Sequence, residues 1–257
     1  MSDAKIHAED FFKFLLADAN APFSGWNFSY ITTTGRMVEA PLAWSYASIL
    51  LNYFRNTQSL LDMGTGGGEF LSFLHPLPTN TCATEGYAPN VPIARQRLKP
   101  LGIQVYEARG NGTLPFADNQ FDLVINRHEA YSAREVWRIL KPGGQFITQQ
   151  VGGSNCTELN SLLGAPSYQY SDWQLDYAVR ELQDAGWHII TQREDHPVTR
   201  FFDIGALVYY LKAIPWQVSD FSLEKYFDRL VELHNKIQQE HYLDVHHYRF
   251  LIIAHKL

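Results

Sequence analysis

Two patterns of apolar and polar positions, one typical of strands and one of helices, alternate from about residue 58 to residue 257. Short apolar runs rich in strand formers are followed by segments with helical spacing of apolar residues, which is the pattern of βαβ units. The runs predict seven strands, at residues 59–63, 81–85, 103–108, 121–125, 145–151, 188–192 and 248–255. Strands that alternate with helices in this way indicate an α/β fold with a parallel sheet.

Capping and breaking residues place helices between these strands. The clearest start signal is the capping box formed by Ser132 and Glu135, in which each side chain can bond the other residue's backbone N–H. Asn90 is a candidate cap for the helix that stops before Lys99 and Pro100. The predicted helices lie at about 69–75, 92–98, 132–140 and 171–186.

Two segments fall outside this rhythm. Residues 1–57 predict a helical N-terminal segment, with helices near 6–17 and from Pro41. Residues 195–246, inside the α/β domain 58–257, predict a helical insertion before the last strand, with one helix capped by Asp203 and a second at about 222–240. We expect both segments to form a lid over the carboxyl ends of the strands, where α/β sheets bind ligands. Cover of a sheet edge is the alternative.

Composition and charge narrow the class of protein. The 257 residues carry a formal net charge of −6, and neither the first 150 residues (12 basic, 13 acidic) nor the remainder (9 basic, 14 acidic) is basic. A non-specific polyanion-binding surface is therefore disfavoured. The two cysteines favour a reducing compartment, and no apolar stretch approaches the ~20 residues that span a bilayer. We therefore expect a soluble cytoplasmic protein. We also expect no metal site, because the spacing of the histidines does not match that of known metal ligands.

A glycine-rich loop follows the first predicted strand. Residues 62–68 read Asp-Met-Gly-Thr-Gly-Gly-Gly and lead into a helix, whose N-terminal N–H groups can hold a ligand. A dinucleotide fingerprint needs a small residue where Glu69 stands, and the Gly-Lys-Ser/Thr of a nucleoside triphosphate loop is missing. Asp62 favours a ligand that carries a positive charge. A purely structural turn is the alternative.

Glu85 supplies the second half of a nucleoside site. It ends the second predicted strand, 21 residues after Gly64. An acid in this place can accept hydrogen bonds from both ribose hydroxyls. The alternative is a solvated carboxylate at a strand end.

Four stretches together resemble the class I, Rossmann-like S-adenosylmethionine-dependent methyltransferases, and within them the type 11 group. The stretches are residues 61–68, Glu85, residues 114–124 (LPFADNQFDLV) and residues 139–144 (ILKPGG). The resemblance covers about residues 58–155. It implies a doubly wound, seven-stranded, mostly parallel sheet with an antiparallel last strand, and S-adenosylmethionine as the cofactor.

The same resemblance implies roles for individual residues. Asp62 would lie near the cofactor's ammonium and Glu85 would hold the ribose. Gly86 stands where an apolar shelf for adenine is usual, so Tyr87 would stack instead. The family's acid that reads the adenine amine has no counterpart, which leaves residues 111–112. The full expected cofactor set is Asp62, Gly64, Thr65, Gly66, Gly68, Glu85, Gly86, Tyr87, Asn111, Gly112, Asn126 and Arg127.

The acceptor side is expected after the fourth predicted strand. His128 is the candidate general base because its unperturbed pKa lies near 6.5, and Glu129 could orient it or act itself. Core packing of His128 and helix capping by Glu129 are the alternatives. Arg36 could bind an acidic substrate, and a surface charge is the alternative. Six aromatic residues could wall an apolar pocket: Trp26, Phe28, Tyr30, Phe201, Phe202 and Tyr209.

These observations favour methyl transfer from S-adenosylmethionine to a small-molecule acceptor by in-line displacement. An RNA base methyltransferase is one alternative, and it would need a basic patch from Arg95, Arg97, Arg127 and Arg134. A protein that binds the cofactor without turnover is another. A nicotinamide-dependent oxidoreductase is disfavoured by Glu69.

Overall fold

The structure is a computed structural model that describes residues 8–24, 27–167 and 170–257. The chain divides into two compact units, each built from three stretches. The large unit comprises Leu42–Gly152, Asp172–Asp195 and Arg249–Leu257, and the small unit Met1–Pro41, Gly153–Ser171 and His196–Tyr248. This division differs from the expected boundary at residue 57. Residues 42–57 belong to the large unit because Trp44, Leu50 and Phe54 are buried in the core of its sheet.

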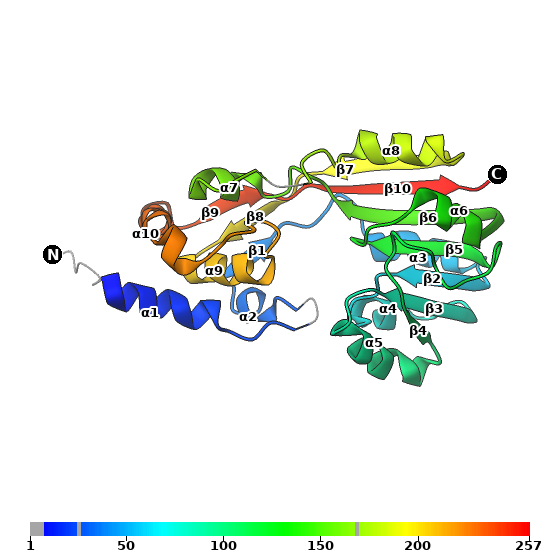
Figure 1. Ribbon diagram of the computed structural model, residues 1–257, viewed down its shortest axis with the longest axis horizontal. Helices are drawn as coiled ribbons and strands as arrows, with labels where there is room; N and C mark the ends of the chain where they lie inside the picture. Colours follow the sequence, from blue (N-terminus) through cyan, green and yellow to red (C-terminus); the bar gives the residue numbers. More distant parts are fainter. Residues whose placement is uncertain (1–7, 25–26, 168–169) are drawn as a thin grey trace. The chain divides into compact units, whose positions relative to one another are not determined.

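The large unit is built on a seven-stranded sheet with the order β4-β3-β2-β5-β6-β10-β7 (Figure 1). Strands β2 to β6 pair in parallel, and β10, the last strand in the chain, runs antiparallel to both β6 and β7. The predicted α/β fold with an antiparallel last strand is confirmed. The strands are β2 (Ser59–Met63), β3 (Asn80–Glu85), β4 (Gln104–Glu107), β5 (Phe121–Arg127), β6 (Leu140–Val151), β7 (His188–Asp195) and β10 (Arg249–His255).

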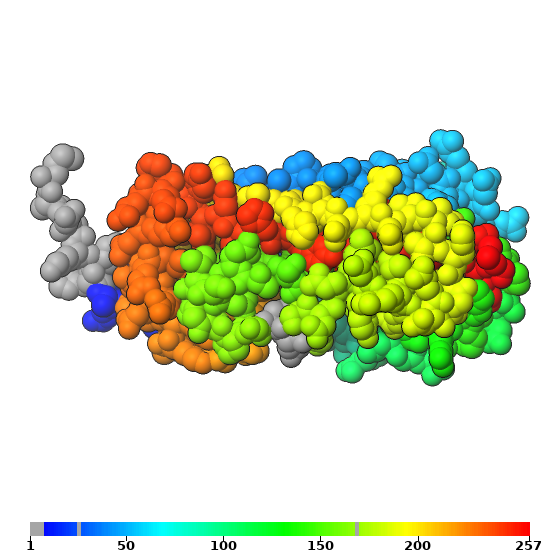
Figure 2. Space-filling model, turned by 90° about the horizontal axis from the view of Figure 1, so that it is seen from above, coloured from blue at the N-terminus to red at the C-terminus, as the bar shows by residue number. Residues whose placement is uncertain are grey.

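Helices and aromatic side chains pack against the sheet of the large unit. Buried residues of α3, α4 and α5 share one apolar core with the strands. A second cluster brings together Phe146 from β6, Trp187 before β7 and Trp137 from α6, in which the Trp137 and Trp187 rings meet edge to face 5.2 Å apart. The outer faces of α8 and β7 form the yellow surface in Figure 2. The helices are α3 (Tyr46–Phe54), α4 (Glu69–Phe73), α5 (Asn90–Leu98), the 3-10 turn η1 (Lys99–Leu101), α6 (Ala133–Ile139) and α8 (Leu175–Asp184).

The small unit combines helices with a three-stranded antiparallel sheet that the sequence patterns do not reveal. The sheet has the order β1-β8-β9. The predicted cap at Asp203 is confirmed, since its side chain accepts from the N–H of Ala206. Ser222 caps the following helix by accepting from the N–H of Lys225. The elements are α1 (Ala8–Ala19), α2 (Ser29–Thr32), β1 (Met37–Glu39), α7 (Thr157–Leu163), β8 (Val198–Phe201), α9 (Ile204–Ala213), α10 (Leu223–Glu240) and β9 (Leu243–His246).

Several aromatic residues expected to wall a pocket lie in the core of the small unit instead. Phe201 is fully buried and Tyr209 is 2% exposed, because α9 is apolar on all sides and is enclosed by α1, α10 and the small sheet. Phe28 packs against the same core, whereas Tyr30 and Phe202 keep about two fifths of their surface exposed. Trp26 lies outside the described residues.

Arg36 is committed to two carboxylates of the small unit. Its guanidinium donates to Asp18 at 2.8 and 3.0 Å and to Asp203 at 2.6 and 2.8 Å. Planar guanidinium groups suit such paired bonds. Donors that Arg36 could offer to an acidic substrate are therefore bonded to protein carboxylates.

Candidate cofactor site

The glycine loop lies where the strand order of the large unit reverses. The chain runs from β2 to β3 and β4 on one side, and then returns to place β5 on the other side of β2. Met63 at the end of β2 pairs with Asn126 near the end of β5. The loop after β2 and residues 128–129 after β5 therefore meet at the carboxyl edge of the sheet, at the position where open α/β sheets bind ligands.

The three alternate glycines of the loop adopt left-handed backbone, with φ of +69° at Gly64, +63° at Gly66 and +81° at Gly68. A Cβ on Gly64 would lie 2.4 Å from the Cβ of Glu129, and one on Gly68 would lie 2.8 Å from the Cγ of Leu98. A Cβ on Gly66 would meet nothing within 4 Å. Gly64 and Gly68 thus allow close packing, while Gly66 keeps open space above the loop.

Glu85 joins the glycine loop to the end of β3. Its Oε2 accepts from the Gly66 N–H at 2.6 Å, and its Oε1 accepts from the Tyr87 N–H at 2.7 Å. Burial raises the pKa of Glu85, and these backbone bonds oppose the rise. A carboxylate offers about four acceptor positions, more than the backbone bonds use, so acceptor capacity is left for a ligand's hydroxyl groups.

Asp62 is a second buried acid at this edge, 5% exposed near the end of β2. Burial raises its pKa to about 7, while the Thr65 side chain and the positive charge of Arg127 oppose the rise. The guanidinium of Arg127 lies 4.6 Å from the centre of the Phe70 ring. Asp62 is therefore poised between its neutral and ionised forms, and a positive charge beside it would favour the ionised form.

Glu129 also lies over the loop. Its side chain touches Gly64, and its Oε1 accepts from the Gly110 N–H at 3.2 Å. Burial and the negative charge of Glu85 raise its pKa. The structure thus brings Asp62, Glu85 and Glu129 around one glycine loop, which is an arrangement suited to a cationic ligand.

Asn126 is fully buried beside the loop. Its Oδ1 accepts from Gln150 Nε2 at 2.8 Å, whereas its Nδ2 has no hydrogen-bond partner among the described residues. Buried amide donors are rarely left without a partner. An orphaned donor of this kind at the carboxyl edge fits a site that a polar ligand completes.

The residues expected to contact adenine lie around the end of β3 and the loop after β4. Gly86 packs so closely against Arg109 that a Cβ would lie 2.9 Å from its Cγ. Tyr87 is 63% exposed. Residues 111–112 are exposed and belong to a turn in which the Gly112 N–H bonds the Arg109 carbonyl at 3.1 Å. Their roles stay predictions.

His128 follows β5 and also adopts left-handed backbone, with a φ of +68°. Its N–H donates to the Gln149 carbonyl at 2.8 Å, and its Nε2 lies 3.2 Å from the Gln149 Nε2. Non-glycine residues seldom adopt this backbone, and they cluster at functional sites. The catalytic roles expected for His128 and Glu129 stay predictions.

Sequence reasoning missed the polar residues that surround His128 and Asn126. Gln149 and Gln150 are 3% and 4% exposed, and they lie in β6 beside β5. The single hydroxyl proton of Tyr46 in α3 has two carbonyl acceptors within reach, those of Asn126 (3.0 Å) and Ile147 (2.9 Å). Two adjacent glutamines inside an otherwise apolar predicted strand are the signal that could have located this polar layer.

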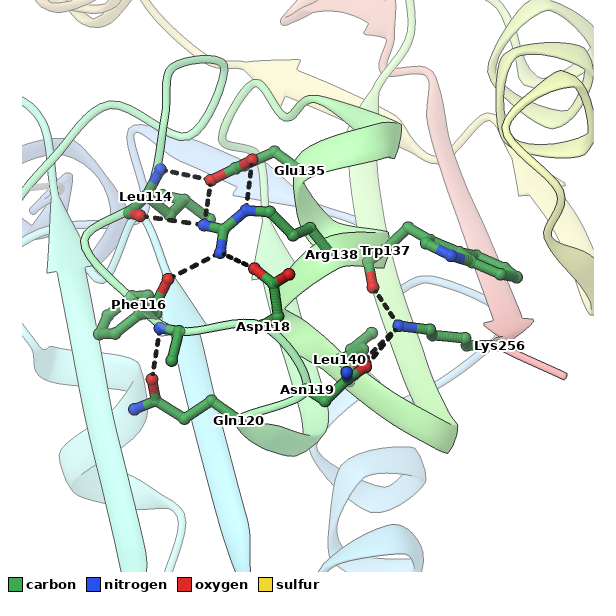
Figure 3. Close-up of polar contacts among 11 residues, drawn as sticks. Leu114, Phe116, Asp118, Asn119, Gln120, Glu135, Trp137, Arg138, Leu140 and Lys256 are labelled. Atoms are coloured by element: carbon green, nitrogen blue, oxygen red, sulfur yellow. Dashed lines mark hydrogen bonds and ion pairs between the residues drawn. The ribbon is translucent and has the colours of Figure 1, made fainter.

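Two of the stretches that carry the family resemblance form hydrogen bonds with the side chains of Arg138 and Lys256 (Figure 3). Arg138 of α6 donates to the carbonyls of Leu114 (3.2 Å) and Phe116 (2.8 Å). It also pairs with Asp118 and Glu135 at 2.7 and 2.5 Å. The loop before β5 is therefore fastened to α6.

Lys256 forms further hydrogen bonds at the C-terminal end of α6 (Figure 3). Its ammonium group donates to Asn119 Oδ1 at 2.9 Å and to the carbonyls of Trp137 and Leu140 at 2.7 and 2.6 Å. These bonds satisfy carbonyls at the end of a helix, which otherwise have no partner within the helix.

Comparison with known proteins agrees with this geometry. The family model described as "Methyltransferase domain" matches residues 61–148, which run from β2 into β6 and include the glycine loop, Glu85 and residues 126–129. Residues 61–148 form a methyltransferase domain. The domain is of the S-adenosylmethionine-dependent, class I type, as the resemblance predicted, and S-adenosylmethionine is its cofactor.

A curated relative matches only a small part of the chain. The uncharacterized protein YafE of Escherichia coli (strain K12) is 52% identical over 46 residues, which are 15% of this chain and 22% of that protein. The chain thus covers about a fifth of that relative's length.

Solved structures share the fold of the methyltransferase domain. A Bacillus halodurans C-125 protein assigned as a methyltransferase is 18% identical with a TM-score of 0.59, over 83% of this chain and 99% of that one. YcgJ of Bacillus subtilis is 16% identical with a TM-score of 0.57, over 82% and 97% of the two chains. A functionally unknown protein from Deinococcus radiodurans R1 is 14% identical with a TM-score of 0.54, over 90% and 100%.

The residues of the methyltransferase domain fit its cofactor. The space above Gly66, the acceptor positions of Glu85 and the buried carboxyl group of Asp62 suit an amino-acid nucleoside that carries positive charge. Within 8–24, 27–167 and 170–257, no cluster of three or more His, Cys, Asp or Glu side chains could hold a metal ion. No helix in these ranges is both long and apolar enough to cross a bilayer.

Proposed function

We propose that this protein transfers a methyl group from S-adenosylmethionine to a small-molecule acceptor by in-line displacement. The observation that carries the proposal is the open space above Gly66, bordered by Glu85 and Asp62 in a methyltransferase domain. Bound S-adenosylmethionine supplies an electrophilic methyl group on a positively charged sulfur atom. The protein then needs chiefly to align donor and acceptor and to exclude water.

The proposed division of labour follows the contacts at the carboxyl edge. Glu85 accepts hydrogen bonds from the ribose hydroxyls, and Asp62 offsets the positive charge of the amino-acid part. The loop from Gly64 through Thr65 and Gly66 to Gly68 forms the floor beneath that part, with Asn126 and Arg127 beside it. Gly86, Tyr87, Asn111 and Gly112 contact the adenine ring.

The acceptor is proposed to touch His128 and Glu129. Both follow β5, and Glu129 already lies against the glycine loop. An acceptor that must lose a proton needs a base nearby, and the raised pKa of Glu129 makes its carboxylate a better proton acceptor than an exposed one.

Charge favours a small molecule over RNA. The net charge of −6 opposes polyanion binding. Three of the four arginines that an RNA-binding patch would use are engaged within the large unit. Arg97 pairs with Glu69, Arg95 donates to the Val105 carbonyl, and Arg127 lies over Phe70. The two cysteines favour a reducing compartment, so we place this activity in the cytoplasm.

The experiment is to follow formation of S-adenosylhomocysteine from S-adenosylmethionine with two acceptor pools. One is a protein-free, RNA-free extract of low-molecular-weight metabolites, and the other is purified total RNA. The proposal predicts turnover with the metabolite pool that Glu85→Gln reduces and Glu107→Gln leaves unchanged. Glu107 is the matched control, because it pairs with Glu85 across β3 and β4 but is exposed. Turnover with RNA alone, or with neither pool, would contradict the proposal.

A further inference from the structure

A buried chain of polar side chains leads from the indole of Trp44 to the ring of His128. The Trp44 Nε1–H donates to Gln149 Oε1 at 2.9 Å, and the other end of the same amide, Nε2, lies 3.2 Å from His128 Nε2. Trp44 is 8% exposed and Gln149 is 3% exposed. All three residues belong to the large unit.

The donors and acceptors in this chain can be arranged in only one way. An indole N–H can only donate, so the amide atom that faces it must be the oxygen of Gln149. The amide nitrogen, which can only donate, therefore faces His128. The ring nitrogen that receives this bond must carry no proton.

We infer that Trp44 and Gln149 are positioning residues that hold His128 as a neutral imidazole with its proton on Nδ1. Gln149 fixes the backbone of His128 as well as its ring, because the Gln149 carbonyl accepts from the His128 N–H at 2.8 Å. It is itself held between β5 and β10, where it pairs with Arg127 and Leu251. The left-handed backbone of His128 is thus kept by the residue that orients its side chain.

This inference rests on the proposed function for its catalytic meaning. With Nε2 accepting from the Gln149 amide and Nδ1 protonated, the ring of His128 cannot take a proton from an acceptor molecule. A positioned, neutral imidazole therefore replaces the general base that the sequence suggested. If the acceptor loses a proton, that proton passes to Glu129 or to solvent.

The direct test is a long-range ¹H–¹⁵N correlation spectrum of the full-length, cofactor-free protein at mildly alkaline pH. Such spectra distinguish protonated from unprotonated ring nitrogens, and His128→Phe identifies the signal among those of the ten histidines. We expect an unprotonated Nε2 and a protonated Nδ1. A protonated Nε2 in the wild-type protein would overturn the inference.

Two substitutions test the positioning roles. Gln149→Glu offers acceptors to both neighbours, so we expect His128 to gain a proton on Nε2 and to remain an imidazolium up to a pH higher by about one unit. Gln145→Glu is the matched control in the same strand, and it should leave the His128 spectrum unchanged. Trp44→Phe removes the donor that orients the amide, so the single tautomer should be lost and both forms should be populated. A His128 spectrum that neither variant alters would refute the positioning roles.

The outcome is independent of the proposed function. Binding of S-adenosylmethionine to the same samples, measured by calorimetry, tests the cofactor site without reference to the histidine tautomer. If His128 carries its proton on Nδ1 but the protein does not bind S-adenosylmethionine, only the proposed function is contradicted. If the protein binds S-adenosylmethionine tightly but Nε2 of His128 is protonated, only this inference is contradicted.

Discussion

Substitution of Gly66 by alanine separates the ligand-binding role of the glycine loop from its structural role. The added Cβ would meet no protein atom within 4 Å, so it enters only the space that the cofactor is proposed to fill. The backbone N–H that bonds Glu85 is retained. Gly64→Ala would not make this distinction, because its Cβ would collide with Glu129.

The expected effects follow from the geometry. Left-handed backbone costs alanine about 1–2 kcal/mol, and a less flexible unfolded chain offsets about 0.4–1 kcal/mol of this. The net loss of stability is therefore about 1 kcal/mol, which lowers Tm by roughly 2–4 °C in a chain of this size. A methyl group forced into a close contact with the cofactor costs about 1–3 kcal/mol, so the affinity should fall roughly 5- to 150-fold.

The assay is calorimetry with S-adenosylmethionine, accompanied by thermal unfolding of each variant. Gly102→Ala is the matched control, because Gly102 also has a positive φ (+73°) and its Cβ would also meet nothing within 4 Å. It should lose the same stability and keep its affinity. Equal affinities for the two alanine variants would show that the cofactor does not occupy the space above Gly66.

Further predictions concern the same unit. Glu85→Gln should weaken S-adenosylmethionine binding by about 1.5–3 kcal/mol, because it removes charge-assisted hydrogen bonds, while Glu107→Gln should not; equal affinity of both variants in calorimetry would remove Glu85 from the site. The affinity for S-adenosylmethionine should rise between about pH 6 and pH 8, and binding should release a proton. The reason is that a cationic ligand favours ionised Asp62, whose pKa is raised to about 7. Asp62→Asn should flatten this pH profile, and an unchanged slope would rule Asp62 out. In the free protein the raised pKa means that folding favours protonated Asp62, so its contribution to stability is complete below about pH 4 and is lost as pH rises through 7. Arg138→Met should cost about 2 kcal/mol in urea unfolding, because it removes bonds to two carbonyls and two carboxylates; the exposed neighbour Arg134→Met should cost little, and equal losses would contradict the structural tie.

Local patterns were enough to predict most of the large sheet. The first predicted strand, 59–63, coincides with β2, and Ser132 caps α6 as its capping box indicated. Residues 141–144, predicted as a turn, instead belong to β6, which begins at Leu140 and has an irregular register with β5. The helix expected from Pro41 begins at Tyr46, because Ser45 provides the cap.

The small sheet could not be predicted from local patterns. Its strands have three or four residues each, too few for a two-residue period to stand out. Met37 pairs with Phe201, and Phe201 with Leu243, so the chain must bring distant segments together before these residues form strands. Such pairings depend on tertiary contacts that no single window of sequence contains.

The candidate site was predictable only in part, for a similar reason. The glycines and Glu85 follow strands in a pattern that the sequence displays directly. Gln149 looks like an ordinary strand residue, and its bonds to Trp44 and His128 depend on the pairing of β5 with β6 and on the placement of the segment before α3. The polar layer therefore became visible only with the structure.

The glycine loop and Glu85 are proposed to bind S-adenosylmethionine. Titration calorimetry of the protein with S-adenosylmethionine, S-adenosylhomocysteine and NAD measures this binding. We expect saturable one-site binding of both sulfur nucleosides and no heat with NAD. Saturable binding of NAD without a response to either sulfur nucleoside would contradict this proposal.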